Sequence, residues 1–246
     1  MIASLPMYDW PHRRAANNAL WAHIGDTLRQ LGLAAPKELS RPKDLHRHWN
    51  RPTLLFSQTC AMPYRLGLWQ ACDVLGTLDY NLPGCEPGQY CSVLIAQIDD
   101  TRRGIEAFDG ARPAVNVLHS QSGWAALNDA AARADINLAK PLLTGAHAAS
   151  IQAVASGHAA LAAIDAVSWH LACDVMAEAA LVKVIGRTRP SPALPLICAK
   201  GQNVTTLRRG LEAAFNHLPN TLRSAHGDLQ FISRDNEIYT QEPWHG

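Results

Sequence analysis

The sequence predicts an α/β protein of two lobes, because short apolar strands alternate with amphipathic helices along most of its 246 residues. Small polar residues follow several of these strands, and ligands bind at the carboxyl ends of strands in open α/β sheets. Two segments, near residues 98–102 and 186–195, take the chain into a second unit and back. We therefore expect lobe 1 at residues 1–98 and 187–246 and an inserted lobe 2 at residues 99–186. Each lobe is expected to be Rossmann-like, with the double crossing as a hinge and a ligand cleft between the lobes.

The composition limits the classes of protein to consider. With 48% apolar and 17% charged residues, the chain is globular and long enough for a substantial core. The net charge of +1 argues against a general nucleic-acid-binding protein, which carries a basic face. No apolar stretch has the length of a bilayer-spanning helix, so we expect no membrane-embedded segment. Residues 1–6 show no charged region followed by an apolar one, so we expect no secretory signal in the chain as given. Either the protein stays in the cytoplasm, which the initial methionine favours, or a signal was removed before this numbering begins.

Lobe 1 opens with a βα unit. An apolar strand at residues 2–5 runs into a segment with two prolines that carries Tyr8 and Trp10. Apolar residues at spacings of four, four and three then predict an amphipathic helix ended by Gly32: Leu20, Ile24, Leu28 and Leu31. Tyr8 and Trp10 are candidate ligand contacts at the strand end, or they cover the end of the core, and both interpretations remain open.

The same order repeats further along lobe 1. An apolar run at residues 53–56 is typical of a buried parallel strand. Ser57, Gln58 and Thr59 follow it as a small polar cluster, and we expect them to contact a ligand. The next predicted elements are a helix at residues 63–71 and strands at residues 73–78 and 90–98.

Polar residues also follow three predicted strands of lobe 2. The strands are the apolar runs at residues 114–118, 141–144 and 159–164, and the residues after them include Ser120 to Gly123, His147 and Asp165. Helices are predicted at residues 105–109, 124–134, about 147–155 and 167–174, and a last strand at 181–185. We expect the three polar positions to line one ligand site.

The segment Ser120-Gln121-Ser122-Gly123 stands where a strand passes into a helix. Unpaired backbone N–H groups and the positive end of the helix dipole favour an anion at such a point. The serine hydroxyls add neutral donors, the glycine lets a ligand approach the backbone, and a protonated His147 would add a charge-assisted bond. A serine before a helix is also an ordinary cap, so the segment alone leaves both interpretations open. The repeated polar strand ends and the double crossing favour the anion site.

The chain returns to lobe 1 through a stiff segment at residues 187–195, which contains three prolines and is expected to be irregular. The last predicted elements are a strand at residues 196–199, an amphipathic helix at 204–218 and a short helix at 237–244.

The cysteines and histidines predict neither a metal site nor a cofactor. The chain has no Cys-x-x-Cys, and His46-Arg47-His48 has no third ligand at a recognisable spacing, so surface histidines are favoured. Most of the six cysteines fit small buried apolar positions. Cys85 and Cys91 flank a Gly/Pro turn, and pairing between them in an oxidising compartment stays open.

These residues carry a family likeness. The chain resembles the phosphate/phosphonate-binding proteins of ABC transporters along nearly its whole length. Ser120-Gln121-Ser122-Gly123 is similar to the family's Ser-x-Ser-Gly cradle, and His147, 25 positions after Ser122, matches a family histidine near the ligand. Residues 157–165 and 89–95 resemble a second-lobe segment and the crossing strand, and residues 57–59 occupy a strand end where relatives place ligand contacts.

The resemblance implies a type II periplasmic-binding-protein-like fold, with no catalysis and no cofactor. It implies capture of a small oxyanion of the phosphate, phosphonate or phosphite type, in the family's setting for an ABC permease. The candidate ligand-binding residues are Tyr8, Trp10, Ser57, Gln58, Thr59, Ser120, Gln121, Ser122, Gly123, His147 and Asp165. Ala160 stands where relatives often have an acidic residue, which leaves Asp165 as the main carboxylate for an amine-bearing ligand. The family implies the periplasm, so the compartment stays open.

Two alternatives remain at this point. A cytoplasmic ligand-binding sensor would share the fold and the site but not the export. An enzyme related to thiamine-pyrimidine synthesis would use Cys60 together with a histidine. Ser122 does not fit a nucleophile elbow, because Gly-x-Ser-x-Gly requires glycine at position 120, where the chain has serine.

Overall fold

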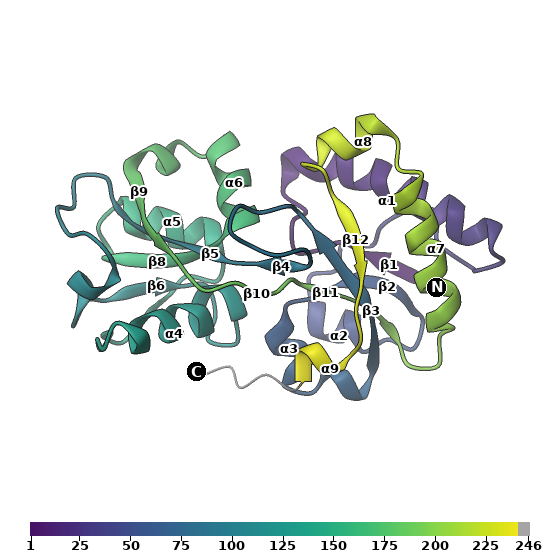
Figure 1. The fold of residues 1–246 in the computed structure, drawn as a ribbon, viewed down its shortest axis with the longest axis horizontal. Helices are drawn as coiled ribbons and strands as arrows, with labels where there is room; N and C mark the ends of the chain where they lie inside the picture. Colours follow the sequence, from purple (N-terminus) through teal and green to yellow (C-terminus); the bar gives the residue numbers. More distant parts are fainter. Residues whose placement is uncertain (241–246) are drawn as a thin grey trace. The chain divides into compact units, whose positions relative to one another are not determined.

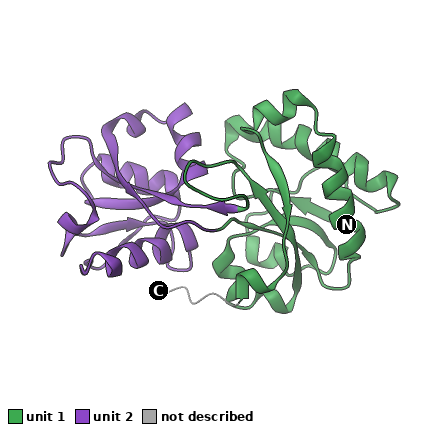
Figure 2. Ribbon diagram, viewed as in Figure 1, with its two compact units in different colours: residues 1–88, 192–242 green, residues 89–191, 243–246 purple. Residues whose placement is uncertain are grey.

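The computed structural model describes residues 1–240, which form two α/β units (Figures 1 and 2). Unit 1 comprises Met1–Gly88 and the described residues from Pro192 onward, and unit 2 comprises Gln89–Ser191. The predicted class, α/β with two lobes and a double crossing, is therefore present. The sheets mix parallel and antiparallel strands.

The boundaries between the units differ from the predicted ones at both crossings. Residues 89–98 and 187–191 were expected in lobe 1 and belong to unit 2. Strand β5 (Ser92–Gln97) is hydrogen-bonded between two strands of unit 2, and the Thr188 N–H donates to the Ser92 carbonyl oxygen at 2.9 Å. The apolar pattern of a strand identifies the strand but not its neighbours, and the neighbours decide its unit.

Unit 1 is built on a five-stranded sheet in the order β1-β2-β11-β3-β12. Only the β1–β2 pair is parallel; the pairs that β11 makes with β2 and β3, and that β12 makes with β3, are antiparallel. The bounds are Ile2–Ser4 for β1, Leu54–Gln58 for β2, Pro195–Ala199 for β11, Cys72–Asp79 for β3 and Gln230–Ser233 for β12.

Helices cover both faces of this sheet, so its central strands are buried on both sides. Strand β11 shows this directly, because Leu196 packs in the core on one face and Ile197 in the core on the other. Helices α1 and α7 supply the first core with residues at helical spacing, among them Leu20, Ile24, Leu28, Leu207 and Leu211. The bounds of the helices are Arg14–Gln30 (α1), Leu45–Trp49 (α2), Ala61–Arg65 (α3), Leu68–Gln70 (η2), Val204–Asn216 (α7), Asn220–Ala225 (α8) and Glu237–Thr240 (α9).

The end of the chain holds two elements that the sequence did not predict, α8 and β12. Helix α9 begins where the last helix was predicted, at Glu237, and the rest of that prediction, to Trp244, falls partly outside the described residues. The six cysteines all lie in the described residues and form no disulfide bond with one another, so Cys85 and Cys91 are not paired with each other. None of the helices in the described part of the chain combines the length and the apolar content that crossing a bilayer requires.

Unit 2 has its own five-stranded sheet, in the order β7-β6-β8-β5-β9. Strands β7, β6 and β8 run parallel to one another, whereas β5 pairs antiparallel with both β8 and β9. The bounds are Pro113–Val115 (β6), Leu142–Leu143 (β7), Leu161–Asp165 (β8), Val182–Arg187 (β9), Ile105–Phe108 (η3), Ala126–Arg133 (α4), His147–Ala155 (α5), Ala166–Val175 (α6) and Ala177–Leu181 (η5).

The core of unit 2 fixes where its strands end. Leu94, Val115 and Leu161 from three strands pack with Phe108 and with Leu127 of α4. Because β6, β7 and β8 are parallel, their carboxyl ends meet at one edge of the sheet. The residues that follow these strands therefore form a common group.

The crossings pair with each other. Strand β4 (Gln89–Tyr90), where the chain leaves unit 1, pairs with β10 (Ser191–Pro192), where it returns. The return segment was expected to be irregular because of its prolines, and it contains this two-residue strand. Pro192 closes β10, a position at the end of a strand where a missing N–H is tolerated.

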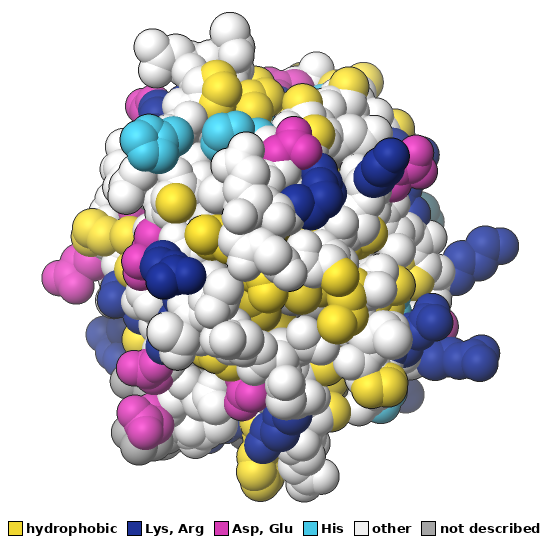
Figure 3. Space-filling view, turned by 90° about the vertical axis from the view of Figure 1, so that its right-hand side faces the viewer, with side chains coloured by type: hydrophobic (Ala, Val, Ile, Leu, Met, Phe, Trp, Pro, Cys, Tyr) yellow, Lys and Arg dark blue, Asp and Glu magenta, His cyan; other side chains and the backbone are white. Residues whose placement is uncertain are grey.

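The surface agrees with the near-neutral charge. Figure 3 shows acidic and basic side chains interspersed over one face of the molecule. On this face the two signs are mixed, in agreement with a net charge of +1.

Gly76 in β3 tests the pairing of the unpredicted strand β12. Its φ is +155°, and an added Cβ would lie 2.4 Å from the carbonyl oxygen of Ile232 in β12. We expect Gly76→Ala to lower the free energy of unfolding by about 2 kcal/mol or more, because a backbone atom must move. At Gly186 in β9 an added Cβ comes no closer than 3.6 Å to Leu94, so Gly186→Ala is the matched control and should cost less than about 1 kcal/mol. Urea unfolding of the two variants measures this, and equal costs would contradict the pairing.

Candidate functional site

The candidate site of unit 2 lies at the carboxyl ends of its parallel strands. Strand β6 ends at Val115, earlier than the predicted Leu118, and a loop leads to Ser120. A π-helical turn, η4 (Gln121–Ala125), then opens the helix, three residues before its predicted start at Trp124. The predicted segment Ser120 to Gly123 is therefore the first turn of this helix rather than a loop before it.

Ser120 is the cap of that turn. Its backbone is extended, and its Oγ accepts a hydrogen bond from the Gly123 N–H at 3.0 Å. Its carbonyl oxygen accepts from the N–H groups of Trp124 and Ala125. The structure thus confirms the ordinary reading of Ser120 as a helix cap. In this cap the Ser120 hydroxyl oxygen accepts a hydrogen bond, however, so the hydroxyl hydrogen is still available to be donated to a ligand.

Ser122 joins the first turns of two helices. Its Oγ lies 2.9 Å from Nε2 of His147, which is the first residue of α5. Its carbonyl oxygen accepts a hydrogen bond from the Ser92 hydroxyl of β5 at 2.9 Å, which ties the turn to the sheet. Ser122 and His147, which are 25 positions apart in the sequence, are thereby in direct contact, and their shared role in binding a ligand stays a prediction.

The imidazole of His147 is neutral at neutral pH. Burial lowers the pKa of His147 from 6.5 to about 4. A protonated His147 with a charge-assisted bond is therefore not the resting state of the protein. The neutral ring still has a hydrogen to place, and the hydroxyl hydrogen of Ser122 can reach a ligand only when Nε2 carries the proton and donates it to Oγ.

The space over Gly123 is filled by a side chain of the protein. We expected Gly123 to let a ligand approach the backbone, but an added Cβ there would lie 2.0 Å from Oδ1 of Asn116. The glycine is needed because the Asn116 amide rests on it. Asn116 follows directly after β6, and sequence reasoning missed it because a lone asparagine in a loop carries no pattern.

Asp165 ends β8 at the same edge of the sheet and is buried. Its Oδ1 accepts a hydrogen bond from the Ser168 N–H at 2.9 Å, so it caps helix α6. The capping of α6 is a structural reason for an aspartate at position 165. Its predicted role as a ligand contact stays a prediction.

Three of the predicted residues of unit 1, Ser57, Gln58 and Thr59, lie at the end of β2 and are buried. The Ser57 hydroxyl contacts the Ser4 hydroxyl at 2.7 Å and accepts from the Trp49 indole N–H at 3.1 Å, and Ser4 in turn contacts His48 at 3.0 Å. Burial, with a smaller contribution from the charge of Arg51, lowers the pKa of His48. This network gives Ser57 a structural role between β1, β2 and α2.

Gln58 and Thr59 follow Ser57 with different surroundings. The Thr59 N–H donates to the Pro195 carbonyl oxygen at 3.0 Å and continues the sheet. Gln58 is only 1% exposed, and its Nε2 has no hydrogen-bond partner within the described residues. A buried amide donor without a partner costs free energy, so Gln58 fits a ligand contact better than its neighbours do.

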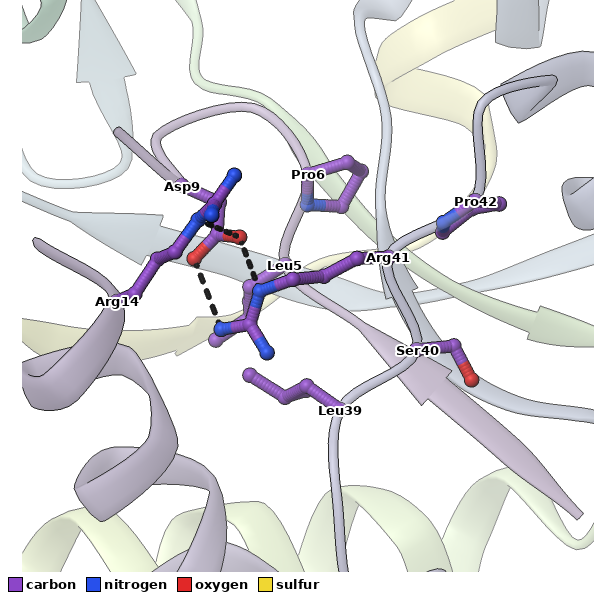
Figure 4. A pocket seen from close by; sticks show the side chains of 8 residues that line it. All are labelled: Leu5, Pro6, Asp9, Arg14, Leu39, Ser40, Arg41 and Pro42. Carbon is purple, nitrogen blue, oxygen red and sulfur yellow. Dashed lines mark hydrogen bonds and ion pairs between the residues drawn. The ribbon is translucent and has the colours of Figure 1, made fainter. Parts of the chain in front are cut away.

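Tyr8 and Trp10 flank Asp9, which anchors their segment. Figure 4 shows the Asp9 carboxylate between two guanidinium groups: Arg41 Nε donates to it at 2.7 Å, and Arg14 Nε lies at 3.7 Å. Tyr8 is buried with its ring edge-on to Tyr80, 5.2 Å between centroids, so the interpretation as a cover over the core fits Tyr8. Sequence reasoning missed Asp9, because its partner Arg41 is 32 residues away in a loop.

No group of three or more histidine, cysteine or acidic side chains in the described residues is placed to hold a metal ion. His48, one of the two histidines considered for a metal, is buried in the Ser4–Ser57 network rather than on the surface as expected.

Comparison with known proteins gives the family. Residues 83–237, more than half of the chain, match the family model of the periplasmic substrate-binding proteins of phosphonate ABC transporters. The chain belongs to this family. Comparison with curated proteins gives no match.

Solved structures of low sequence identity share the fold of this family member. PhnD1 from Prochlorococcus marinus, in complex with methylphosphonate, has a TM-score of 0.75 and 12% identity over 97% of this chain and 94% of its own. XAC2383 from Xanthomonas citri, bound to ATP, has a TM-score of 0.71 and 15% identity over 97% and 95%. The sulphonate-binding protein SsuA from Escherichia coli has a TM-score of 0.60 and 12% identity over 97% and 82%. The predicted periplasmic-binding-protein fold is confirmed.

The contact between Gly123 and Asn116 predicts a rescue. Gly123→Ala should lower the free energy of unfolding by about 1–3 kcal/mol, because the new methyl group meets the Asn116 amide. Adding Asn116→Ala should recover part of this loss, since it removes the atom that is in the way. Urea unfolding of the two single variants and the double variant measures the coupling between them. Strictly additive costs would show that the two side chains do not compete for this space.

The pKa of His147 predicts a pH dependence of stability. Between about pH 6.5 and pH 4 the unfolded chain binds more protons at this histidine than the folded protein does. Stability therefore falls as the pH falls through this window, by at most about 3 kcal/mol from this group. His147→Gln should remove that part of the pH dependence, and His170→Gln, at an exposed position of α6, should leave it in place. Urea unfolding at several pH values measures this. If the free energy of unfolding changes with pH in the same way in the wild type and in His147→Gln, the burial of the ring is contradicted.

Proposed function

We propose that this family member is a solute-binding protein that holds the head group of a small phosphonate-, phosphite- or phosphate-type oxyanion at the 120–123 turn and His147. The contact of 2.9 Å between Ser122 and His147 carries the proposal, because it joins the first turns of two helices of unit 2. Helix first turns offer unpaired N–H groups and a positive dipole end to the same anion. The family adds an ABC permease as the partner that receives the ligand.

The electrostatics of these residues suit an anion that accepts several hydrogen bonds. The hydroxyls of Ser120 and Ser122 and the neutral ring of His147 are dipoles without net charge. Such donors can replace the water around a phosphoryl group one hydrogen bond at a time, without burying an unpaired cation when the site is empty. Reversible capture, rather than permanent retention, follows from this chemistry.

The proposal includes no catalysis, although a serine next to a histidine is the geometry of a nucleophile and its base. The Nδ1 atom of His147 is buried and has no hydrogen-bond partner in the described part of the chain, so no carboxylate orients the ring. The lowered pKa of His147 also makes it a weak base. Both features favour a hydrogen-bonding role over proton transfer.

Isothermal titration calorimetry with methylphosphonate, phosphite and phosphate tests the proposal. The wild-type protein should bind at least one of them. The double variant Ser120→Ala, Ser122→Ala should bind at least about tenfold more weakly, because two hydrogen bonds to a charged group are lost. Ser156→Ala, which removes an exposed hydroxyl at the other end of α5, is the matched control and should bind as the wild type does. No binding of any of the three anions, or unchanged binding by the double variant, would overturn the proposal.

A further inference from the structure

Ser92, the first residue of β5, connects the 120–123 turn to the sheet. Its hydroxyl donates to the carbonyl oxygen of Ser122 at 2.9 Å, and both residues are buried. Strand β5 runs antiparallel to β8, with Ser92 opposite Asp165, so β5 begins at the edge of the sheet where β8 ends. This antiparallel pairing brings a residue of the outgoing crossing to the proposed anion site.

The backbone of Ser92 is held by Thr188, which follows β9 and is also buried. The Ser92 N–H donates to Oγ1 of Thr188 at 2.9 Å, and the Thr188 N–H donates to the carbonyl oxygen of Ser92 at 2.9 Å. Both polar hydrogens of Ser92, on its backbone nitrogen and on its hydroxyl, are therefore used within the protein. Ser92 has no hydrogen to give to an anion, so any part it plays in binding comes from what it holds in place.

The turn that Ser92 contacts is π-helical, a rare form. In an α-helix the N–H of Ala126 would donate to the carbonyl oxygen of Ser122, four residues before it. Here the Ala126 N–H donates to the carbonyl oxygen of Gln121 instead. The Ser92 hydroxyl thus bonds a carbonyl oxygen whose α-helical donor is directed elsewhere. Because a buried carbonyl oxygen without a donor is costly, this bond favours the π-helical form of the turn.

The form of the turn sets the position of the Ser122 hydroxyl. A π-helical turn contains more residues than an α-helical one, so a change between the two rotates its side chains about the helix axis. In the π-helical form Ser122 Oγ lies 2.9 Å from Nε2 of His147. Relaxation to an α-helical turn would move Ser122 Oγ away from the ring and from the anion that the two residues are proposed to share.

We infer that Ser92 is a positioning residue of the proposed anion site. Its hydroxyl keeps the 120–123 turn π-helical and thereby keeps the Ser122 hydroxyl against His147, without touching the ligand. Thr188 holds Ser92 in turn, so residues next to both crossings support the site. The inference rests on the proposed function and adds to it a residue that acts through Ser122.

Calorimetry with whichever of methylphosphonate, phosphite and phosphate binds the wild type most tightly is the first test. Ser92→Ala should bind this anion at least about fivefold more weakly, the effect expected of one lost hydrogen bond. Ser92→Thr keeps the hydroxyl and should bind within about twofold of the wild type. If Ser92→Ala does not fold, as judged by its thermal melting, Ser92→Cys takes its place, because a thiol is only a weak donor.

Thr77→Val in unit 1 is the matched control. It also removes a buried hydroxyl that donates to a backbone carbonyl oxygen, that of Leu194 at 2.8 Å. Urea unfolding should show that Thr77→Val and Ser92→Ala are both less stable than the wild type. Only Ser92→Ala should lose affinity for the anion, because only that variant changes the turn.

The ring of His147 provides a measurement that needs no ligand. Its ¹⁵N chemical shifts report the hydrogen bond at Nε2, and comparison with His147→Gln identifies its signals in the NMR spectrum. These signals should move in Ser92→Ala, because the Ser122 hydroxyl leaves the ring. They should stay near their wild-type positions in Ser92→Thr and in Thr77→Val.

The outcomes separate this inference from the proposed function. If the wild type binds none of the three anions, the proposed function fails, and the ring signals of His147 decide whether Ser92 positions Ser122. If the wild type binds an anion and Ser92→Ala binds it equally tightly, the proposed function stands and the inference is overturned. Equal losses of affinity in Ser92→Ala and Thr77→Val would also overturn it, since they would reflect a general loss of stability.

Discussion

The parallel pairing of β6 with β7 and β8 is the constraint on which the candidate site depends. Parallel strands end at the same edge of a sheet, so the chain must return through a helix after each strand and start the next helix near the last one. The Ser122–His147 contact is a direct result, since it joins the start of the helix after β6 with the start of the helix after β7. The antiparallel strand β5 supports this edge, because its Ser92 hydroxyl holds the carbonyl oxygen of Ser122.

The candidate site combines groups that cap helices with groups whose hydrogen-bonding capacity is not fully used within the described residues. Ser120 and Asp165 satisfy N–H groups of their own helices, and this use of a side chain is sufficient reason for their presence. Ser122, His147 and Asn116 are different, because their partners within the protein leave a hydrogen or a lone pair unused. Whether a residue serves as a helix cap or is available to a ligand therefore has to be decided atom by atom, from the hydrogen bonds that each atom makes.

Local sequence patterns predicted most of the elements, and they failed where long-range pairing decides. Apolar spacing identified α1 and α7, and polar residues after strands identified Ser122 and His147, because these signals depend on neighbours along the chain. Strand β12 has only two apolar residues and is held by its pairing with β3, and the unit of β5 depends on β8 and β9. Asn116 and Asp9 were missed for the same reason, since their roles come from contacts with Gly123 and Arg41.

The place of β11 in the first sheet has a consequence for how the protein is made. This strand lies between β2 and β3, yet the whole of unit 2 separates it from both of them in the chain. When the ribosome has synthesised residues 1–88, β2 and β3 are present, but β11, the strand that lies between them in the sheet, has not yet been synthesised. Unit 2, continuous from Gln89 to Ser191, has all its strands before β11 is synthesised. The order of synthesis thus places completion of unit 2, which carries the candidate site, ahead of completion of unit 1, which surrounds it in sequence.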